Sequence, residues 1–407
     1  MLEHWVWLTT REGIGTRGCA ALLRLYGSAE EIYARDESAY RKTEGFERRW
    51  LRSLSDKPLE GAEKILALCE EKQIKLLTYN DPAYPQRLKN IADPPAVLYY
   101  KGTVPDFDRE AAIAVVGSRR CTPYGMMHAK QFGRLIANSG GVVVSGGARG
   151  IDTMALRGAL ESTMPVVCVL GCGVDVAYPR ENKALFEQIA AHGCVLSEFP
   201  PETPPEARNF PVRNRLLSGL SLGVLVVEAP ERSGALITAN LALEQGRDVF
   251  AVPGNIGVKA CEGSNRLIRE GASMVEDGWE VLREYSCRFP GKLEDGRSRD
   301  AMRRIFQARY GLALPVYTPV VFSDTSDKKV VDNPAPKPYS DEKELPANLS
   351  EDEKAVLVLL SDKAIHSDTL VAESGLPAQR VTAALTLLQI KQLALKLAGN
   401  YYQRKFL

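Results

Sequence analysis

Two glycine loops in the middle of the chain carry arginine side chains, and each loop follows a short apolar run. The first loop contains Gly117, Ser118 and Arg119, and the second contains Arg149. A guanidinium group forms paired hydrogen bonds with phosphate oxygens, and glycine lets the backbone approach a ligand closely. These residue types in this order predict a phosphate-binding crevice.

The elements that must hold these loops form a βαβα unit. The β-branched runs 113–116 and 142–144 predict parallel strands, each of which leads through its glycine loop into a helix. Thr122 followed by Pro123 is typical of a helix start, because the hydroxyl caps the backbone and proline lacks an N–H that would need a partner there. Both loops should therefore lie at the carboxyl ends of the strands, where open α/β sheets bind ligands.

The first loop does not fit a dinucleotide-binding protein. Its sequence, GSRRCTPYG, departs from the pattern G-x-G-x-x-G. The second strand ends in Ser145 and glycines, not in the acidic residue that would accept the ribose hydroxyl of NAD. We therefore expect phosphate binding without NAD.

The composition fits a globular protein of two or three domains. The 407 residues are 45% hydrophobic and 25% charged, with a net charge of +1, so a nucleic-acid partner would need a local concentration of arginine. The N-terminus lacks the pattern of a signal peptide, and no apolar run is long enough to span a bilayer. The eight cysteines contain no C-x-x-C pair. These features predict a cytoplasmic protein with free thiols and no membrane partner.

The chain divides into five predicted segments, and the central one is a doubly wound α/β domain with basic residues collected at its strand ends. The segments are a small helical domain at 1–72, an extended docking segment at 73–106, a Rossmann-like parallel-sheet domain at 107–285, a proline-rich linker at 286–348 and a winged-helix domain at 349–407.

The two helical segments each allow two interpretations. The glycine turn within 13–28 resembles part of a helix-hairpin-helix or sterile-alpha-motif-like bundle and could contact DNA phosphates, but few arginines lie nearby, which favours a purely structural domain. In the C-terminal segment, a major-groove contact would use Gln379 and Arg380. The rest of that helix is mostly apolar, which favours protein contact or autoregulation over duplex DNA.

Acidic residues at strand ends and helix starts raise the question of catalysis. They are Asp152, Asp175, Glu198 and Glu228, of which Glu228 is the candidate general base. The alternative, which the excess of arginine favours, is that these acids hold arginines and cap helices. None of the four histidines is spaced as in a metal site.

Six motifs, taken in order, resemble the DNA-processing protein A family, also called DprA or Smf. The resemblance covers the doubly wound domain and the preceding segment, and more loosely both helical ends. The motifs are VVGSRRCTPYG, SGGARGID, LGCGVDVAYPRENKALF, NFPVRNRLLSGLS, RSGALITANLALEQGRDVFAVPG and GSNRLIREGA.

This resemblance implies a bacterial cytoplasmic protein of natural transformation that binds and protects incoming single-stranded DNA and loads a RecA-type recombinase onto it. Members of the family are similar in forming a homodimer through the Rossmann-like core, and they need no cofactor and catalyse no reaction. The phosphate-contacting arginine of the family falls on Arg119, and its basic residue before the GID motif falls on Arg149. Its RNR segment falls on Arg213, Asn214 and Arg215.

The predicted DNA site combines these residues with one aromatic side chain. Phe210, next to the RNR segment, is the best of four aromatic candidates for stacking on a base, the others being Tyr124, Tyr178 and Phe199. The predicted set is Gly117, Ser118, Arg119, Arg149, Lys183, Phe210, Arg213, Asn214 and Arg215.

A nucleotide-processing enzyme of the phosphoribohydrolase type is the rival interpretation, because related folds carry a P-G-G-x-G-T-x-x-E loop. The corresponding stretch here is APERSGALITANLALE. Ser233-Gly234 lacks the double glycine, although Glu244 follows on the helix.

Overall fold

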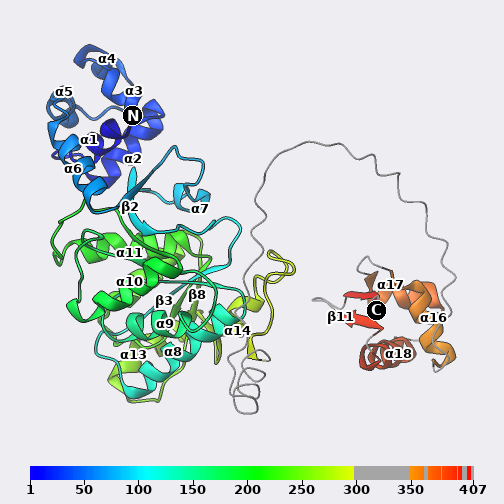
Figure 1. Cartoon of the computed structure of the whole chain (residues 1–407). Coiled ribbons are helices and arrows are strands. Elements are labelled where there is room, and N and C mark those ends of the chain that lie inside the picture. The colour runs from blue at the N-terminus through cyan, green and yellow to red at the C-terminus, as the bar shows by residue number, and fades with distance from the viewer. Residues whose placement is uncertain (298–348, 362–364, 377, 392, 397–400, 405–407) are drawn as a thin grey trace. The chain divides into compact units, whose positions relative to one another are not determined.

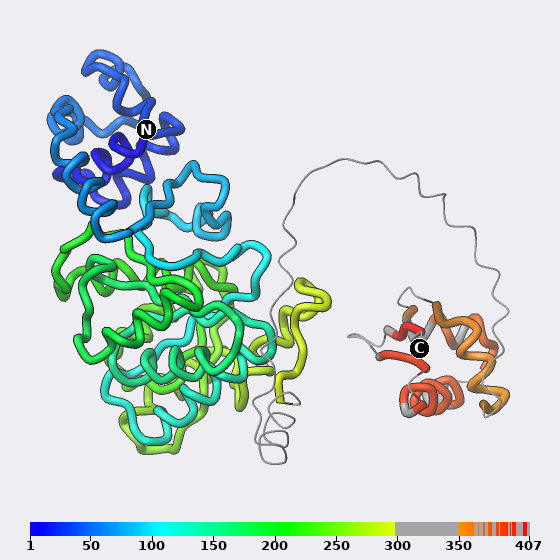
Figure 2. Tube along the Cα trace, in the orientation of Figure 1, coloured from blue at the N-terminus to red at the C-terminus, as the bar shows by residue number. Residues whose placement is uncertain are grey.

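The computed structural model describes the chain apart from residues 298–348, 362–364, 377, 392, 397–400 and 405–407 (Figures 1 and 2). The described residues form two compact units, which lie within residues 1–321 and 322–407. Most of the predicted linker, residues 298–348, lies outside the described part. None of the described helices is both long and apolar enough to cross a membrane.

Residues 1–72 fold into a bundle of short helices around an aromatic core. Trp7 and Tyr40 are fully buried there, and the Tyr40 ring stacks on Phe46 with centroids 5.1 Å apart. At the end of the bundle, Lys72 Nζ lies 2.6 Å from a carboxylate oxygen of Asp175, which ties the helices to the next domain. The elements are α1 (Leu2–Thr9), α2 (Gly15–Tyr26), α3 (Ala29–Ala34), α4 (Glu37–Lys42), η1 (Arg48–Trp50), α5 (Leu51–Ser55) and α6 (Glu60–Glu71).

A nine-stranded sheet forms the centre of the first unit, in the order β1-β2-β6-β5-β4-β3-β7-β8-β9. The seven strands from β6 to β9 in this order are parallel, whereas β1 and β2 from the docking segment form an antiparallel extension. The strands are β1 (Lys75–Thr78), β2 (Val97–Gly102), β3 (Ala112–Val116), β4 (Val142–Ser145), β5 (Val166–Val169), β6 (Cys194–Ser197), β7 (Gly223–Val226), β8 (Asp248–Ala251) and β9 (Ser273–Met274).

Helices cover both faces of this sheet (Figure 1), so alternate residues of each strand enter two different cores. In β3, Ile113 and Val115 face one core, and Ala112 and Ala114 face the other. The first core is closed by α8 (Pro123–Asn138), α9 (Ile151–Ala159), α10 (Lys183–His192) and α14 (Gly278–Arg283). The second core is closed by α7 (Gln86–Lys89), α11 (Asn209–Leu220), α12 (Gly234–Glu244) and α13 (Glu262–Arg269). Two short turns, η2 (Arg180–Asn182) and η3 (Lys259–Cys261), precede α10 and α13.

Burial on both faces explains why the strands are uniformly apolar runs. All five residues of β3 are buried, which is typical of a parallel sheet covered on both sides. The expected helix starts are also present, because Thr122 accepts a hydrogen bond from Gly125 N and Ser233 accepts one from Ala235 N. The predicted doubly wound architecture is therefore confirmed.

The compact domain continues beyond residue 285. Phe289 and Leu293 are buried against the first core, and Gly296 N donates a hydrogen bond to Ser139 Oγ at 2.9 Å. Residues 286–297, which the sequence pattern assigned to the linker, therefore pack against the end of α8.

The second unit is a winged helix with its own core. Three helices, α16 (Glu351–Leu359), α17 (Ser367–Ser374) and α18 (Ala378–Ile390), pack with a sheet in the order β10-β12-β11. These strands are β10 (Ile365–His366), β11 (Ala394–Lys396) and β12 (Tyr401–Arg404). Ser350 and Glu353 form a reciprocal capping box at the start of α16. The predicted winged helix is confirmed.

Candidate nucleic-acid interface

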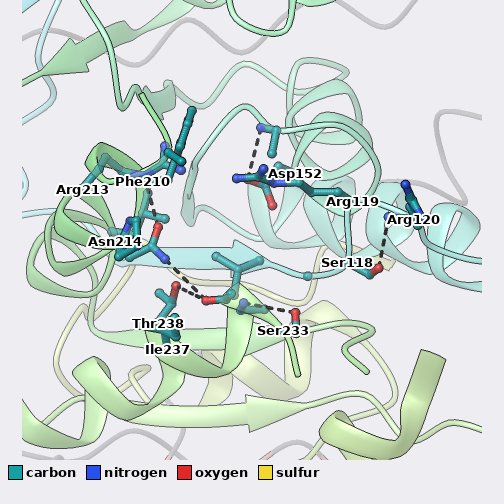
Figure 3. A pocket seen from close by; sticks show the side chains of 18 of the residues that line it. Ser118, Arg119, Arg120, Asp152, Phe210, Arg213, Asn214, Ser233, Ile237 and Thr238 are labelled. Atoms are coloured by element: carbon teal, nitrogen blue, oxygen red, sulfur yellow. Dashed lines mark hydrogen bonds between the residues drawn. The ribbon is translucent and has the colours of Figure 1, made fainter. Parts of the chain in front are cut away.

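A crevice of about 610 Å³ opens at the carboxyl ends of the central strands (Figure 3). It lies where the strand order reverses, since β3 pairs in parallel with β4 on one side and with β7 on the other. Open α/β sheets bind ligands at such a switch point. The loops after β3, β4 and β7 contribute to its walls, together with the first turns of α11 and α12.

The backbone and the side chain of Glu228 form hydrogen bonds that fix the loop after β3. The backbone N–H of Ser118 donates to the Glu228 carbonyl at 2.7 Å, and the Glu228 carboxylate accepts from Thr122 N at 2.9 Å and from Thr122 Oγ1 at 2.5 Å. Gly117 is required sterically, because a Cβ atom there would lie 2.5 Å from the Ile151 side chain. The fully buried Glu228 therefore fixes the predicted phosphate loop and the start of α8.

Arg119 projects from this loop over an aromatic ring. Its guanidinium carbon lies 5.0 Å from the centroid of Phe210, which is in the first turn of α11. The Phe210 ring also lies 5.5 Å from that of Tyr178, and a Cβ atom at Gly171 would approach it to 2.9 Å. Arg119 is exposed, and within residues 1–297 the structure pairs it with no carboxylate. A cation and an aromatic ring thus lie together at the crevice.

Arg213 forms part of the crevice wall from a buried position. Its guanidinium donates to the carbonyl of Gly146 at 2.8 Å and also to the carbonyl of Val169. Burial lowers the pKa of this guanidinium, and the nearby carboxylate of Asp152 opposes that shift. Gly146 leaves room for the group, because a Cβ atom there would lie 2.5 Å from it.

Asp152 lies near the start of α9 and also lines the crevice. It is only 5% exposed, and its carboxylate accepts a hydrogen bond from Ala148 N at 3.3 Å. Burial raises the pKa of this carboxyl to about 6, although Arg213 and Arg119 act in the opposite direction. The crevice therefore holds one buried acid between two arginines.

The structure separates Arg215 from the crevice. Its guanidinium lies 2.8 and 2.6 Å from the two carboxylate oxygens of Glu198 and 3.2 Å from Asp93. Both Arg215 and Glu198 are buried. Successive helix residues point about 100° apart, so Arg213 and Arg215 lie on nearly opposite sides of α11. Arg215 is therefore a scaffold residue here and is not accessible to phosphate.

Of three further residues in the predicted set, one lines the crevice and two do not. Asn214 lines the crevice, and its amide donates to the Gly234 carbonyl at 3.4 Å, which links α11 to α12. Arg149 is exposed, forms a two-point ion pair with Glu181 and does not line the crevice. Lys183 begins α10, is exposed and does not line the crevice.

Two exposed arginines of the crevice were absent from the predicted set. Arg120 follows Arg119 in the first loop, and Arg232 precedes the Ser233 cap of α12. Within residues 1–297 neither has a carboxylate partner. A sequence signal did exist for Arg232, because it follows an apolar strand and precedes a helix start, as Arg119 does.

Three of the four acids that could have served catalysis are engaged with the scaffold, and the fourth, Asp152, lines the crevice. Glu198 holds Arg215, Glu228 holds the first loop, and Asp175 binds Lys72 and accepts from Glu202 N at 2.9 Å. Among the side chains that the structure describes, no group of three or more His, Cys, Asp or Glu could hold a metal ion.

Helix α18 of the winged helix has fewer side chains that could bind DNA phosphates than the crevice has. Arg380 is the only charged residue of α18, and its guanidinium lies 2.7 Å from the carboxylate of Asp352 on α16. The side chain of Gln379 lies outside the described set. The exposed residues of α18 that the structure describes further along are Ala383, Thr386 and Leu387, of which only Thr386 has a side chain that can donate to a phosphate.

Comparison with known proteins shows similarity along the whole chain. The family model for DNA recombination-mediator protein A matches residues 75–286, and the DprA winged helix domain model matches residues 340–400. Protein Smf of Synechocystis sp. is 31% identical over 406 residues, covering 99% of this chain and 98% of that protein. DNA processing protein DprA of Bacillus subtilis is 42% identical over 229 residues, covering 56% of this chain and 77% of that protein.

A solved structure agrees with the fold as well. The X-ray structure of DNA processing protein A from Streptococcus pneumoniae has a TM-score of 0.61 and 33% sequence identity. The match covers 70% of this chain and 98% of the other.

Proposed function

The chain belongs to the DNA-processing protein A (DprA/Smf) family, and from this premise we propose that its crevice binds single-stranded DNA. The observation that carries the proposal is the position of Arg119, exposed and set over Phe210. A phosphate and an unpaired base are adjacent groups of one strand, and single-strand sites combine basic grooves with aromatic rings. In a duplex the bases are stacked inside and could not reach the ring.

The position of Glu244 argues against the nucleotide-processing alternative. Ser233 caps the first turn of α12, whereas Glu244 is its last residue. At 1.5 Å per residue these positions lie about 16 Å apart along the helix axis, so Glu244 cannot act in the crevice. We therefore propose that the strand is bound without chemical change. Release of free base from nucleoside monophosphates by the purified protein would contradict this.

We further propose that the protein acts in natural transformation, protecting incoming single strands and loading a RecA-type recombinase onto them. Family membership supports this role, and related proteins from Bacillus subtilis and Streptococcus pneumoniae carry the name DNA processing protein. If the crevice holds the strand through its backbone, the bases that do not stack on Phe210 stay accessible to the recombinase.

We also propose that the chain forms a homodimer, and an apolar surface at the edge of the sheet supports this. The β9-edge patch consists of Tyr124, Met127, Ile256, Val258 and Met274, whose exposed fractions range from 36% to 100%. Tyr124 Oη donates to the Pro253 carbonyl at 2.9 Å, and Met274 pairs with Ala251 at the end of β8, so these segments adjoin. Large exposed apolar side chains on adjoining segments are typical of protein interfaces.

The dimer can be tested by light scattering at micromolar concentration. We expect a dimer for the native chain and a monomer for Ile256→Asp/Met274→Asp, because two buried carboxylates would oppose association. Leu243→Asp is the control, since Leu243 is 60% exposed and lies on α12 away from the patch. A monomeric native protein would contradict the proposal.

The central proposal is tested by titrating the full chain with single- and double-stranded oligonucleotides of equal length at several salt concentrations. We expect tighter binding to the single strand, with log affinity falling linearly against log salt. Equal or tighter binding to the duplex would contradict the proposal.

A further inference from the structure

We propose that Asp152 takes up one proton when a strand phosphate enters the crevice, so that single-strand binding by this protein tightens as the pH falls. The inference rests on the proposed function of the crevice and assigns its pH response to one side chain. It follows from three features of the site: the position of the carboxyl, the charges that face it and the charge of the ligand.

The carboxyl of Asp152 is part of the crevice wall and is nearly removed from solvent. Figure 3 shows it beside Arg119 in the same pocket. The side chain is 5% exposed, and two backbone groups lie against it, Ala148 N at 3.3 Å and that of Gly146. Water therefore offers little screening between this carboxyl and a ligand in the crevice.

Titratable groups from three elements face Asp152, and two of these groups are charged. The two charged groups are Arg213 on α11 and Arg119 in the loop after β3. The thiols of Cys168 on β5 and of Cys121 lie close enough to interact electrostatically with the Asp152 carboxylate. Burial raises the pKa of both thiols above that of an ordinary cysteine, so both stay neutral near pH 7. The carboxyl is then the group in this cluster that can change its charge between pH 6 and pH 8.

A bound phosphodiester would compete directly with that carboxylate. Its single negative charge needs the same two guanidinium groups, Arg119 and Arg213, that stabilise the ionised form of Asp152. A second anion close by disfavours ionisation and raises the pKa of a carboxyl. The proton comes from solvent and goes to a carboxylate oxygen of Asp152, which becomes neutral and able to donate a hydrogen bond to a phosphate oxygen.

The direction of the pH effect follows from linkage. Burial already raises the pKa of Asp152 to about 6 in the free protein, and a bound anion would raise it further. Binding then takes up a proton at any pH between the free and bound pKa values. Affinity should rise as the pH falls from about 8 towards about 6, by at most about tenfold per pH unit for one proton, and should level off below the free value.

The test measures the affinity of the full chain for oligothymidylate between pH 5.5 and pH 8.5 at one salt concentration. Thymine and the phosphodiester do not titrate in this range, so a pH response would come from the protein. We expect the native chain to bind several-fold more tightly at pH 6 than at pH 8. Asp152→Asn should bind tightly at both and show a flat profile, because the amide resembles the protonated carboxyl.

The control variant is His128→Gln. His128 lies on α8 with its ring 4.1 Å from Tyr124, does not line the crevice, and has a pKa lowered by burial, so it would be the obvious rival source of a pH response. Its substitution should leave the native pH profile intact. If it flattens the profile instead, or if Asp152→Asn keeps the native profile, the assignment to Asp152 is wrong.

A second measurement needs no variant and covers the case in which Asp152→Asn does not fold. Calorimetric titration of the native chain in buffers of different ionisation enthalpy reports the protons taken up on binding. We expect net proton uptake near pH 7, of at most one proton, and no uptake would overturn the inference. Salt-dependent binding without any pH response would overturn this inference alone, whereas no binding to single strands at any pH would overturn the proposed function itself.

Discussion

The guanidinium carbon of Arg119 lies 5.0 Å from the centre of the Phe210 ring, so the two groups expected to hold a phosphate and a base are in contact with each other. Arg119 comes from the loop after β3, and Phe210 comes from the first turn of α11. Two elements nearly a hundred residues apart thus form one recognition unit. The ring orients the cation, and the cation covers part of the ring.

Replacing Arg119 with alanine should weaken binding to all single-stranded sequences alike. Each phosphate neutralised in a single strand contributes about 0.7 to the slope of log affinity against log salt, so the slope should flatten by about that amount. Arg269→Ala is the control, because Arg269 is also exposed but lies at the end of α13 and does not line the crevice. Oligonucleotide titrations at four salt concentrations would measure both quantities. An unchanged affinity and slope for folded Arg119→Ala would show that the crevice is not the DNA site.

Removing Phe210 should weaken both the stacking on a base and the phosphate contact of Arg119. Phe210→Ala would lose stacking of about 1–3 kcal/mol and also the surface that orients Arg119. The double variant Arg119→Ala/Phe210→Ala should therefore lose less than the sum of the single losses, with a coupling on the order of 0.5–3 kcal/mol. Phe210→Leu, which keeps apolar volume without a π face, separates packing from stacking. Strictly additive losses would mean that the contact has no role in binding.

The strands, the glycine loops and the helix caps could be predicted because each depends on local chemistry. Thr122 caps α8 and Ser233 caps α12, as their sequence neighbours indicated. Arg119 was predictable for the same reason, since it follows a strand and precedes a helix in a glycine loop. Its contact with Phe210 was not, because that contact depends on how α11 packs against the loop.

The RNR segment shows where local patterns fail. Three consecutive polar residues suggest one continuous basic contact, but a helix turns each residue about 100° from the last. Arg213 therefore reaches the crevice, whereas Arg215 meets Glu198 and Asp93. Those two acids come from other parts of the chain, and no spacing in the sequence brings them to Arg215.

Substituting Arg215 should lower stability more than it changes the intrinsic affinity for DNA. Arg215→Met would leave Glu198 and Asp93 without their cation, and breaking a buried ion pair by removing one partner costs about 3–5 kcal/mol. Urea denaturation would measure the loss. Arg215→Met/Glu198→Met, which also removes the buried carboxylate of Glu198, should recover part of it. A variant with native stability but much weaker DNA binding would show instead that Arg215 contacts the strand.

Neutralising Glu181 tests whether Arg149 contacts DNA. The two side chains form an exposed ion pair, with 63% and 52% of their surfaces accessible, so Glu181 competes with any phosphate for this guanidinium. Glu181→Gln should leave the unfolding midpoint nearly unchanged, because exposed pairs contribute little to stability. If Arg149 then engages a phosphate, affinity for single strands should rise, and the salt slope should steepen by about 0.7. Glu187→Gln makes the same charge change on an exposed position of α10 and is the matched control. If the two variants bind single strands identically, Arg149 is not a contact.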